Sequence, residues 1–192
     1  MSVIPAFELG FWNAWIFILP VLLLIFIGNR LTKKRKMESL SEYISDFSKK
    51  GKILLTILVL PILGSYLYSI FLPLKLGTIW FYIGFVIYLV GLIIQIIAWQ
   101  NLATASVDKP VTKGVYRISR NPMYIGDFLT FFSIAIVSLS WIFLLVVIIS
   151  VINNYIAVIS EERECLVKYG DEYREYMDRI PRWIGKPKSR KT

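Results

Sequence analysis

The sequence contains no histidine and only one cysteine, and these two scarcities exclude several classes of chemistry. Without histidine there is no Ser-His-Asp or Cys-His nucleophile, no histidine general base, and no histidine-ligated zinc or haem. Cys165 alone cannot form an internal disulfide or a Cys-x-x-Cys site, and we interpret it as a small apolar filler on a helix. We therefore expect no metal site and no redox chemistry.

Acidic residues are also few, with 13 Asp and Glu against 22 Lys and Arg, which gives a formal net charge of +9. Such an excess can indicate a nucleic-acid partner, but here the basic residues lie in the gaps between long apolar runs. Orientation in a bilayer explains that placement better, so we expect no nucleic-acid partner. At 56% hydrophobic residues, the chain is predicted to be one membrane domain over residues 1–192.

The apolar runs predict an all-α, polytopic membrane protein with five transmembrane helices. A helix needs about 20 apolar residues to cross the hydrocarbon core, and a run twice that long is broken at Ser138-Leu139-Ser140-Trp141. The N-terminus lacks the basic region and cleavage site of a signal peptide, so we expect the first run to be retained as a span. The expected spans cover residues 9–28, 53–73, 79–99, 124–139 and 141–160.

The basic residues alternate between the connections of these spans. Lys and Arg number eight between Arg30 and Lys52, four between Lys109 and Arg120, and nine from Arg163 onward, against one at Lys75. The positive-inside rule then predicts an outside N-terminus, a cytoplasmic C-terminus and a multi-pass protein of the cell membrane.

Two further helical segments are expected on the cytoplasmic side. Leu40, Tyr43, Ile44 and Phe47 fall at helical spacing and predict a short helix in the headgroup layer, either as an anchor or to recruit an anionic lipid substrate. After the last span, residues 161–184 predict a cytoplasmic helical segment, interrupted at Gly170-Asp171 and ended by Pro181. Residues 185–192 are interpreted as a basic tail.

Polar residues within or beside the spans are functional hypotheses, because intramembrane polarity is costly. Gln95, Asn153 and Asn154 could equally bridge neighbouring helices. Asp127 is interpreted first as a first-turn carboxylate that pairs with a helix N-terminus and with Arg117 or Arg120. The remaining polar residues of this kind are Glu161 and Glu162.

Glu161 and Glu162 are adjacent carboxylates that repel each other, and a ligand with an ammonium group and hydroxyl donors would relieve that repulsion. Arg120-Asn121-Pro122 offers donors and a new helix N-terminus, which favour a carboxylate. Tyr116 and Tyr124 flank this segment with ring faces that suit an adenine or a sulfonium. Together these groups are typical of a nucleoside-binding site.

These motifs resemble the integral-membrane methyltransferases that include isoprenylcysteine carboxyl methyltransferases and phospholipid N-methyltransferases. The resemblance extends from Asn101 to Arg182. It is carried, in order, by Gly114-Val115-Tyr116, Arg120-x-Pro122-x-Tyr124, Glu161-Glu162 and Gly170-x-x-Tyr173-x-x-Tyr176.

The resemblance implies S-adenosylmethionine as the methyl donor, bound at the cytoplasmic face, where residues 161–184 complete the site. Tyr116, Asn121 and Tyr124 would position the reactants. The family often has histidine at the position of Asn121, and its eukaryotic carboxyl methyltransferases have arginine at the position of Ala157. The implied cofactor contacts are Asn101, Asp108, Val111, Tyr116, Asn121, Pro122, Met123, Tyr124, Glu161 and Glu162.

The function implied by the resemblance is methyl transfer to a carboxylate, amine or thiol of a lipid or isoprenoid substrate. Methyl transfer from a sulfonium needs alignment and desolvation more than acid or base groups, so the lack of histidine is no obstacle. The alternatives are a small membrane transporter or channel subunit, with Gln95, Asp127 and Asn153 along its path, and a non-catalytic adaptor with the same fold. A reductase of similar architecture is a further alternative, but the sequence has no glycine-rich nicotinamide motif.

Overall fold

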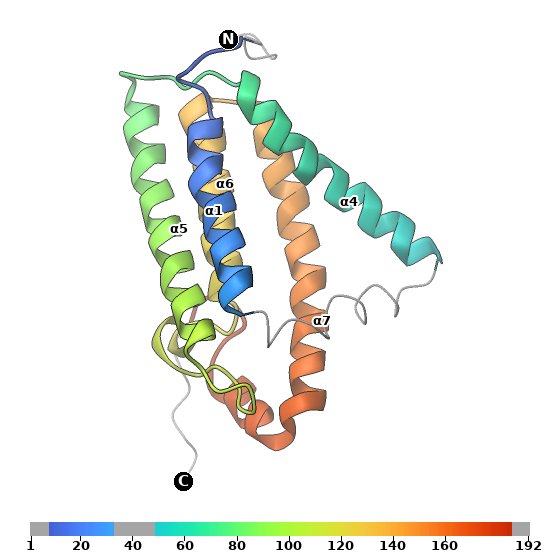
Figure 1. The fold of residues 1–192 in the computed structure, drawn as a ribbon. Coiled ribbons are helices and arrows are strands. Elements are labelled where there is room, and N and C mark those ends of the chain that lie inside the picture. Colours follow the sequence, from blue (N-terminus) through green and yellow to red (C-terminus); the bar gives the residue numbers. More distant parts are fainter. Residues whose placement is uncertain (1–7, 33–48, 186–192) are drawn as a thin grey trace.

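The structure, a computed structural model, describes residues 8–32 and 49–185. All its named elements are helical, and no strand occurs in these two ranges, which confirms the predicted all-α class. The interfacial helix predicted around residues 39–47 and the tail after residue 185 lie outside the described residues. Figure 1 shows the elements in chain order: α1 (Trp15–Leu31), α4 (Lys49–Tyr68), η1 (Ser69–Phe71), α5 (Ile79–Ala103), η2 (Gly114–Arg117), α6 (Pro122–Ser138) and α7 (Trp141–Arg179).

The long helices form a bundle whose surface is strongly apolar. In the described part of the chain, α5 and α7 are long and apolar enough to cross a membrane. Only 28% of the apolar stretch of α5 and 22% of that of α7 is buried inside the structure. Apolar helices this exposed suit contact with lipid better than the interior of a soluble protein. Three further apolar helical stretches are shorter by the same measure: α1 (Trp15–Leu31), α6 (Pro122–Ser138) and Val59–Phe71, which combines the second part of α4 with η1.

Small residues bring α5 and α6 into close contact, and this is the most extensive helix pair in the bundle. A Cβ atom on Gly126 would lie 2.5 Å from Gln95 Cγ and 2.9 Å from the carbonyl oxygen of Gly91. Gln95 is buried and donates from Nε2 to Thr130 Oγ1 at 3.2 Å. Glycine contacts and interhelical hydrogen bonds are the usual means by which helices associate in lipid. Gln95 therefore bridges α5 and α6, which is one of the two roles predicted for it from the sequence.

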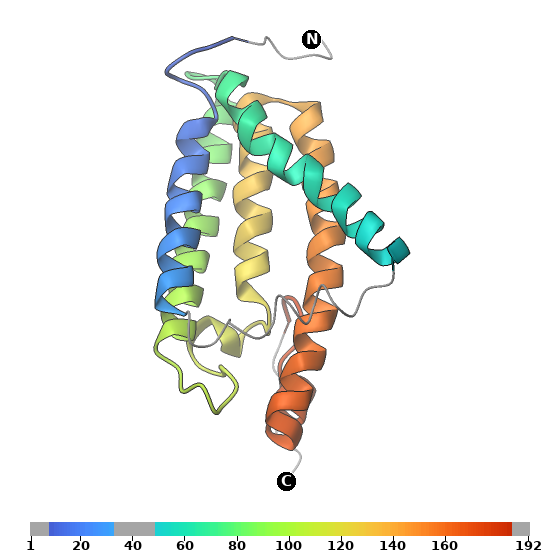
Figure 2. The ribbon, with the colours of Figure 1, turned by 45° about the vertical axis from the view of Figure 1, so that its right-hand side comes forward.

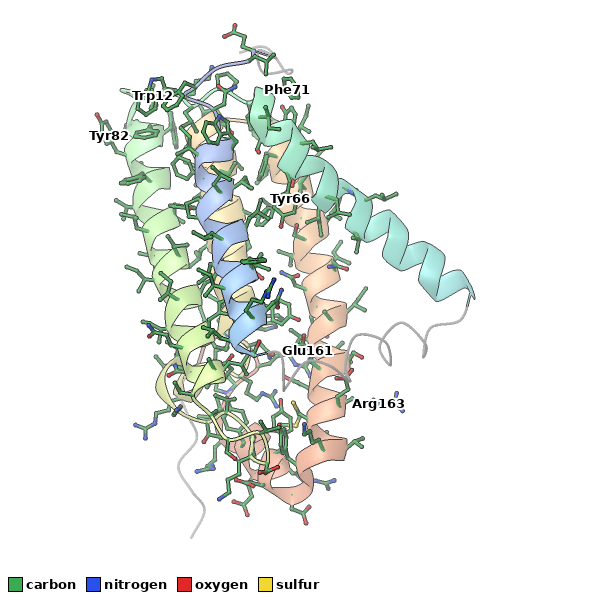
Figure 3. All side chains as sticks on the ribbon, viewed as in Figure 1. Trp12, Tyr66, Phe71, Tyr82, Glu161 and Arg163 are labelled. Carbon is green, nitrogen blue, oxygen red and sulfur yellow. The ribbon has the colours of Figure 1, made fainter. Side chains whose placement is uncertain are left out.

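At the end of the bundle that contains the described N-terminal residues, a short paired segment fixes α1. Asn13 and Pro73 form an isolated antiparallel bridge, and Asn13 Nδ2 donates to the carbonyl oxygens of Glu8 and Ile70, at 2.7 Å each. Because residues 8–14 are paired in this way, α1 begins at Trp15 and not at Leu9, where the apolar run begins. Figure 3 shows Trp12, Phe71 and Tyr82 at this end, far from Glu161.

A tight turn joins α6 to α7 at the break that the sequence predicted. Leu139 adopts a left-handed conformation with φ of 53°, and Ser140 Oγ accepts a hydrogen bond from Phe143 N at 3.1 Å, which caps α7. Such a residue and such a cap end one helix and begin the next with few residues between them. The two helices therefore run antiparallel, as Figures 1 and 2 show.

Beyond the apolar part, α7 continues to Arg179 and is kinked at Gly170, whose φ of 55° and ψ of −129° are not helical. The kink reverses the chain, so that residues 180–185 return toward the start of α6 (Figure 2). The break at Gly170 and the end of the helix just before Pro181 both match the sequence interpretation. This reversal brings three distant segments to one end of the bundle.

The contact between α5 and α6 gives a first prediction. We expect Gly126→Ala to destabilise the protein by about 1–3 kcal/mol, because the added methyl overlaps Gln95 and the backbone of Gly91. The matched control is Gly64→Ala, because a Cβ at Gly64 meets no atom within 4 Å. Thermal unfolding in detergent measures both variants, and equal midpoints would contradict the packing argument.

Candidate functional site

The candidate site lies at the end of the bundle opposite Trp12, where three segments meet. They are the loop at residues 104–121 with the start of α6, the part of α7 near Glu161, and residues 180–185 (Figures 1 and 3). Arg120 N donates to the carbonyl oxygen of Pro181 at 3.0 Å. Ser119 Oγ donates to the carbonyl oxygen of Arg182 at 3.1 Å. The returning C-terminal segment is thus bound directly to the residues that precede α6.

The carboxylate of Glu162 is the centre of this junction. The residue is only 3% exposed, and its Oε2 accepts from Arg182 Nη2 at 2.8 Å and from Nε at 3.1 Å. Its Oε1 accepts from Asn121 Nδ2 at 3.1 Å and lies 3.5 Å from Arg120 Nε. A buried charge is costly unless it is paired and hydrogen-bonded, and here both conditions are met.

This arrangement changes the interpretation of the two adjacent carboxylates. The sequence suggested that a ligand would relieve their repulsion, whereas Arg120 and Arg182 neutralise Glu162 from within the chain. The hydrogen bonds from Arg182 to Glu162 raise the pKa of the Arg182 guanidinium, so Arg182 stays protonated. Arg182 did not stand out in the sequence because it lies next to a basic tail. Its position directly after the helix-ending Pro181 is the one signal that could have marked it.

Glu161 is exposed, in contrast to Glu162, because adjacent residues on a helix point about 100° apart. Its Oε1 accepts from the hydroxyl of Tyr124 at 2.6 Å, a bond that joins α7 to the first turn of α6. In Figure 3, Glu161 lies on the side of α7 that faces the bundle, while Arg163 points away from it. Tyr124 and Glu161 therefore form an accessible polar pair beside the buried junction.

A small apolar cluster supports the loop before α6. Tyr116 and Val111, each 8% exposed, pack with Ala98 of α5, and Met123 packs against this cluster. The hydroxyl of Tyr176 donates to the carbonyl oxygen of Tyr116 at 2.7 Å. Burial raises the pKa of the Tyr176 hydroxyl, so it stays protonated as a donor. This bond fastens the second half of α7 to the loop, and three of the predicted contact residues lie in one cluster.

Some buried donors in the described residues have no hydrogen-bond partner. They are Asn101 Nδ2 and the Nε and Nη1 atoms of Arg120. The amide of Asn101 lies directly against Gly114, which has a positive φ of 57° and leaves no room for a Cβ atom beside that amide. Because buried polar groups are normally paired, such atoms are expected where a ligand supplies the missing acceptor.

The remaining predicted contacts are placed as follows. Pro122 is buried at the first position of α6, where a missing N–H costs nothing. Asp108 is exposed in the loop, and that loop is held to α7 by the hydroxyl of Tyr169, which donates to Val107 O at 3.0 Å. The role of Asp108 in the site stays a prediction.

Asp127 does not have the position first expected for it. The first turn of α6 contains no acidic residue, and Arg120 pairs with Glu162 instead. The interpretation of Asp127 as a first-turn carboxylate is therefore wrong, because α6 begins at Pro122 and Asp127 lies in its second turn. Asp127 lines a cavity together with Asn153 and Asn154 of α7.

Two comparisons with known proteins bear on the family of the chain. The family model described as phospholipid methyltransferase matches residues 74–172, which is half of the chain. The chain belongs to this family. The match includes α5, the loop, α6 and α7 as far as Glu172, and so every predicted contact residue. No curated protein matches the chain. Membership in the phospholipid methyltransferase family identifies a methyltransferase that associates with the membrane.

The two carboxylates of this methyltransferase give a second prediction. We expect Glu162→Gln to lower the free energy of unfolding by about 3–5 kcal/mol, because it leaves Arg120 buried without its counter-charge. Glu161→Gln makes the same chemical change at an exposed position and should alter stability by less than about 0.5 kcal/mol. Thermal unfolding in detergent compares the two, and equal losses would show that Glu162 is not the centre of the junction.

Proposed function

We propose that the chain transfers a methyl group from S-adenosylmethionine to a carboxylate, amine or thiol of a lipid or isoprenoid substrate at the cytoplasmic face of the membrane. Family membership supports the transfer of a methyl group to an acceptor at the membrane. The residues at the junction around Glu162 support S-adenosylmethionine as the methyl donor.

One observation carries the assignment of S-adenosylmethionine as the methyl donor: the buried guanidinium of Arg120 has N–H groups without hydrogen-bond partners, and it belongs to a trio with an excess positive charge. Arg120 and Arg182 are two guanidinium groups that share one carboxylate, so the trio with Glu162 has one positive charge in excess. Arg120 Nε and Nη1 have no hydrogen-bond partner, nor does Asn101 Nδ2. The methionine carboxylate of S-adenosylmethionine would supply both the negative charge and the acceptors. The residues present therefore fit this cofactor.

The other predicted contacts have complementary roles in this proposal. Tyr124 and Glu161 would hold the ribose hydroxyls and the ammonium group of S-adenosylmethionine. The two residues are hydrogen-bonded to each other and offer a hydroxyl group and an exposed carboxylate. Val111 and Met123 give an apolar wall, and Tyr116 shapes it from within the cluster. Asn121, Pro122 and Glu162 would act mainly through position, because they fix the start of α6. Asn101 and Asp108 would close the site from α5 and its following loop.

Methyl transfer from S-adenosylmethionine requires little acid or base catalysis. S-adenosylmethionine supplies an electrophilic methyl group on a positively charged sulfur. The residues around it align the acceptor and exclude water, which are the main requirements of a displacement at carbon. Asn121 is occupied in this role, since its Nδ2 donates to both Glu162 Oε1 and the carbonyl oxygen of Arg182. A histidine at this position is thus not needed for the junction to form.

The proposed placement in the membrane follows the sequence interpretation. Five spans would put residues 104–121 and the end of α7 on the cytoplasmic side, together with most of the basic residues. The exposed aromatic residues at the opposite end, among them Trp12 at 60% and Tyr82 at 58%, suit the other membrane interface.

The unpartnered amide of Asn101 gives a third prediction. We expect Asn101→Ala to weaken the binding of S-adenosylmethionine about 2- to 10-fold, the usual value of one hydrogen bond, without any loss of stability. The substitution removes a donor that has no hydrogen-bond partner in the folded chain, so no hydrogen bond from that donor is lost. The control is Gln100→Ala on the exposed face of the same helix.

Binding of radiolabelled S-adenosylmethionine to protein in lipid nanodiscs measures the effect, and thermal unfolding checks the fold. An absence of saturable binding to the unaltered protein would overturn the proposed donor. Equal affinities of both variants would overturn only the role of Asn101.

The proposed topology gives a fourth prediction. In a Cys165→Ser background, Leu9→Cys and Val167→Cys place single thiols at positions that are 79% and 84% exposed, at opposite ends of the bundle. We expect a membrane-impermeant maleimide to label Leu9→Cys in intact cells and Val167→Cys only after permeabilisation. The reverse pattern would invert the topology, and labelling of both in intact cells would contradict a crossing between them.

A further inference from the structure

The two arginine partners of Glu162 share its carboxylate unequally. Arg182 donates to Oε2 from Nη2 at 2.8 Å and from Nε at 3.1 Å. Arg120 Nε lies 3.5 Å from Oε1, and among the described residues neither this Nε nor Nη1 of the same guanidinium has a hydrogen-bond partner. An arginine beside a carboxylate frequently donates two parallel hydrogen bonds to it. Arg182 makes these bonds here, and Arg120 is paired with Glu162 by charge alone.

The depth of the two arginines makes this division unexpected. The side chain of Arg120 is 9% exposed, and that of Arg182 is 32% exposed. Water can satisfy the N–H groups of the more exposed guanidinium, whereas a buried N–H group depends on the protein or on a ligand. For folding alone, Glu162 would therefore serve Arg120 better than Arg182. The division favours a function in which the N–H groups of Arg120 receive another acceptor.

Several contacts fix Arg182 beside Glu162. The carbonyl oxygen of Arg182 accepts from Ser119 Oγ at 3.1 Å and from Asn121 Nδ2 at 3.2 Å. Its guanidinium carbon lies 6.0 Å from the centroid of the Tyr155 ring. Asn121 Nδ2 also donates to Glu162 Oε1 at 3.1 Å, which orients the carboxylate. A change of the Arg182 side chain would thus leave the main-chain contacts of this segment in place.

Loss of the Arg182 guanidinium would change two properties of Arg120. The trio of two guanidinium groups and one carboxylate has one positive charge in excess, and without Arg182 the remaining pair is neutral. Glu162 would also be released toward Arg120, which is already 3.5 Å away, and could accept its unpaired N–H groups. An incoming carboxylate would then find neither the excess charge nor the vacant donors.

We propose that Arg182 is a positioning residue that gives the site its preference for a ligand with a carboxylate, because it draws Glu162 away from Arg120. This inference rests on the proposed function, in which Arg120 holds the methionine carboxylate of S-adenosylmethionine. It assigns ligand selection to a residue beyond positions 74–172, the part of the chain that matches the family model. The returning C-terminal segment thus acts in binding as well as in folding.

Two ligands isolate the contribution of the carboxylate. S-adenosylmethionine and decarboxylated S-adenosylmethionine differ only in that group, and titration calorimetry in lipid nanodiscs gives the Kd of each. We expect the unaltered protein to prefer S-adenosylmethionine by about 10- to 100-fold, the usual value of hydrogen bonds to a charged group. In Arg182→Gln this preference should fall to about 3-fold or less, because Arg120 is then neutralised by Glu162. The Kd of the decarboxylated ligand should stay within about 2-fold, since that ligand makes no use of Arg120.

Two further variants serve as controls. Arg182→Lys keeps a positive charge that can pair with Glu162 Oε2, so it should retain a preference of about 10-fold. Arg179→Gln removes an exposed arginine just before the same segment, whose Nε donates only to the carbonyl oxygen of Glu175, and it should leave both Kd values unchanged.

The ratio of the two Kd values separates a positioning role from a structural one. If Arg182→Gln keeps the preference, or weakens both ligands equally, the inference is wrong and the proposed function stands. If Arg182→Gln does not fold, Arg182→Lys decides, because a lost preference there would overturn the inference and a retained one would support it. If S-adenosylmethionine does not bind to the unaltered protein, the proposed function fails, and with it this inference.

Discussion

The ion pairs and hydrogen bonds of the buried Glu162 carboxylate are the interactions on which the rest of this end of the molecule depends. The carboxylate is held by Arg120 and Asn121 from the segment before α6 and by Arg182 from the returning C-terminal segment. Glu162 lies 41 residues after Asn121 and 20 residues before Arg182. A single charge in a poorly hydrated position must attract partners from wherever the chain can supply them. Glu162 thus holds together the loop at residues 104–121, the start of α6 and the C-terminal segment at residues 180–185.

Around that anchor, the bundle separates two environments along α6 and α7. Close to Glu162 lie the hydrogen-bonded pair Tyr124 and Glu161 and the unpartnered N–H groups of Arg120, which suit a polar and charged ligand. One to two turns deeper, Asp127, Asn153 and Asn154 line a cavity with apolar walls. Two rigid helices that carry residues for both environments fix the distance between them.

The sequence predicted the helices well because their signals are local. The apolar runs, the serine cap at Ser140, the kink at Gly170 and the stop before Pro181 each depend on a few neighbouring residues. The start of α1 was misplaced because Asn13 pairs with residues almost 60 positions away. The roles of Glu162 and Arg182 could not be predicted for the same reason, since their partnership exists only after the chain reverses. Asp127 was misassigned by one helical turn, because the helix start could not be placed closely enough from the pattern alone.

The reversal at Gly170 also has a consequence for shortened forms of the chain. α5, α6 and the apolar part of α7 all precede the reversal, whereas Arg182, which donates twice to Glu162 Oε2, comes after it. A premature stop codon between Gly170 and Arg182 would therefore leave Glu162 with Arg120 and Asn121 but without Arg182. Such a chain would keep its apolar helices and lack the segment that completes the polar end around Glu162.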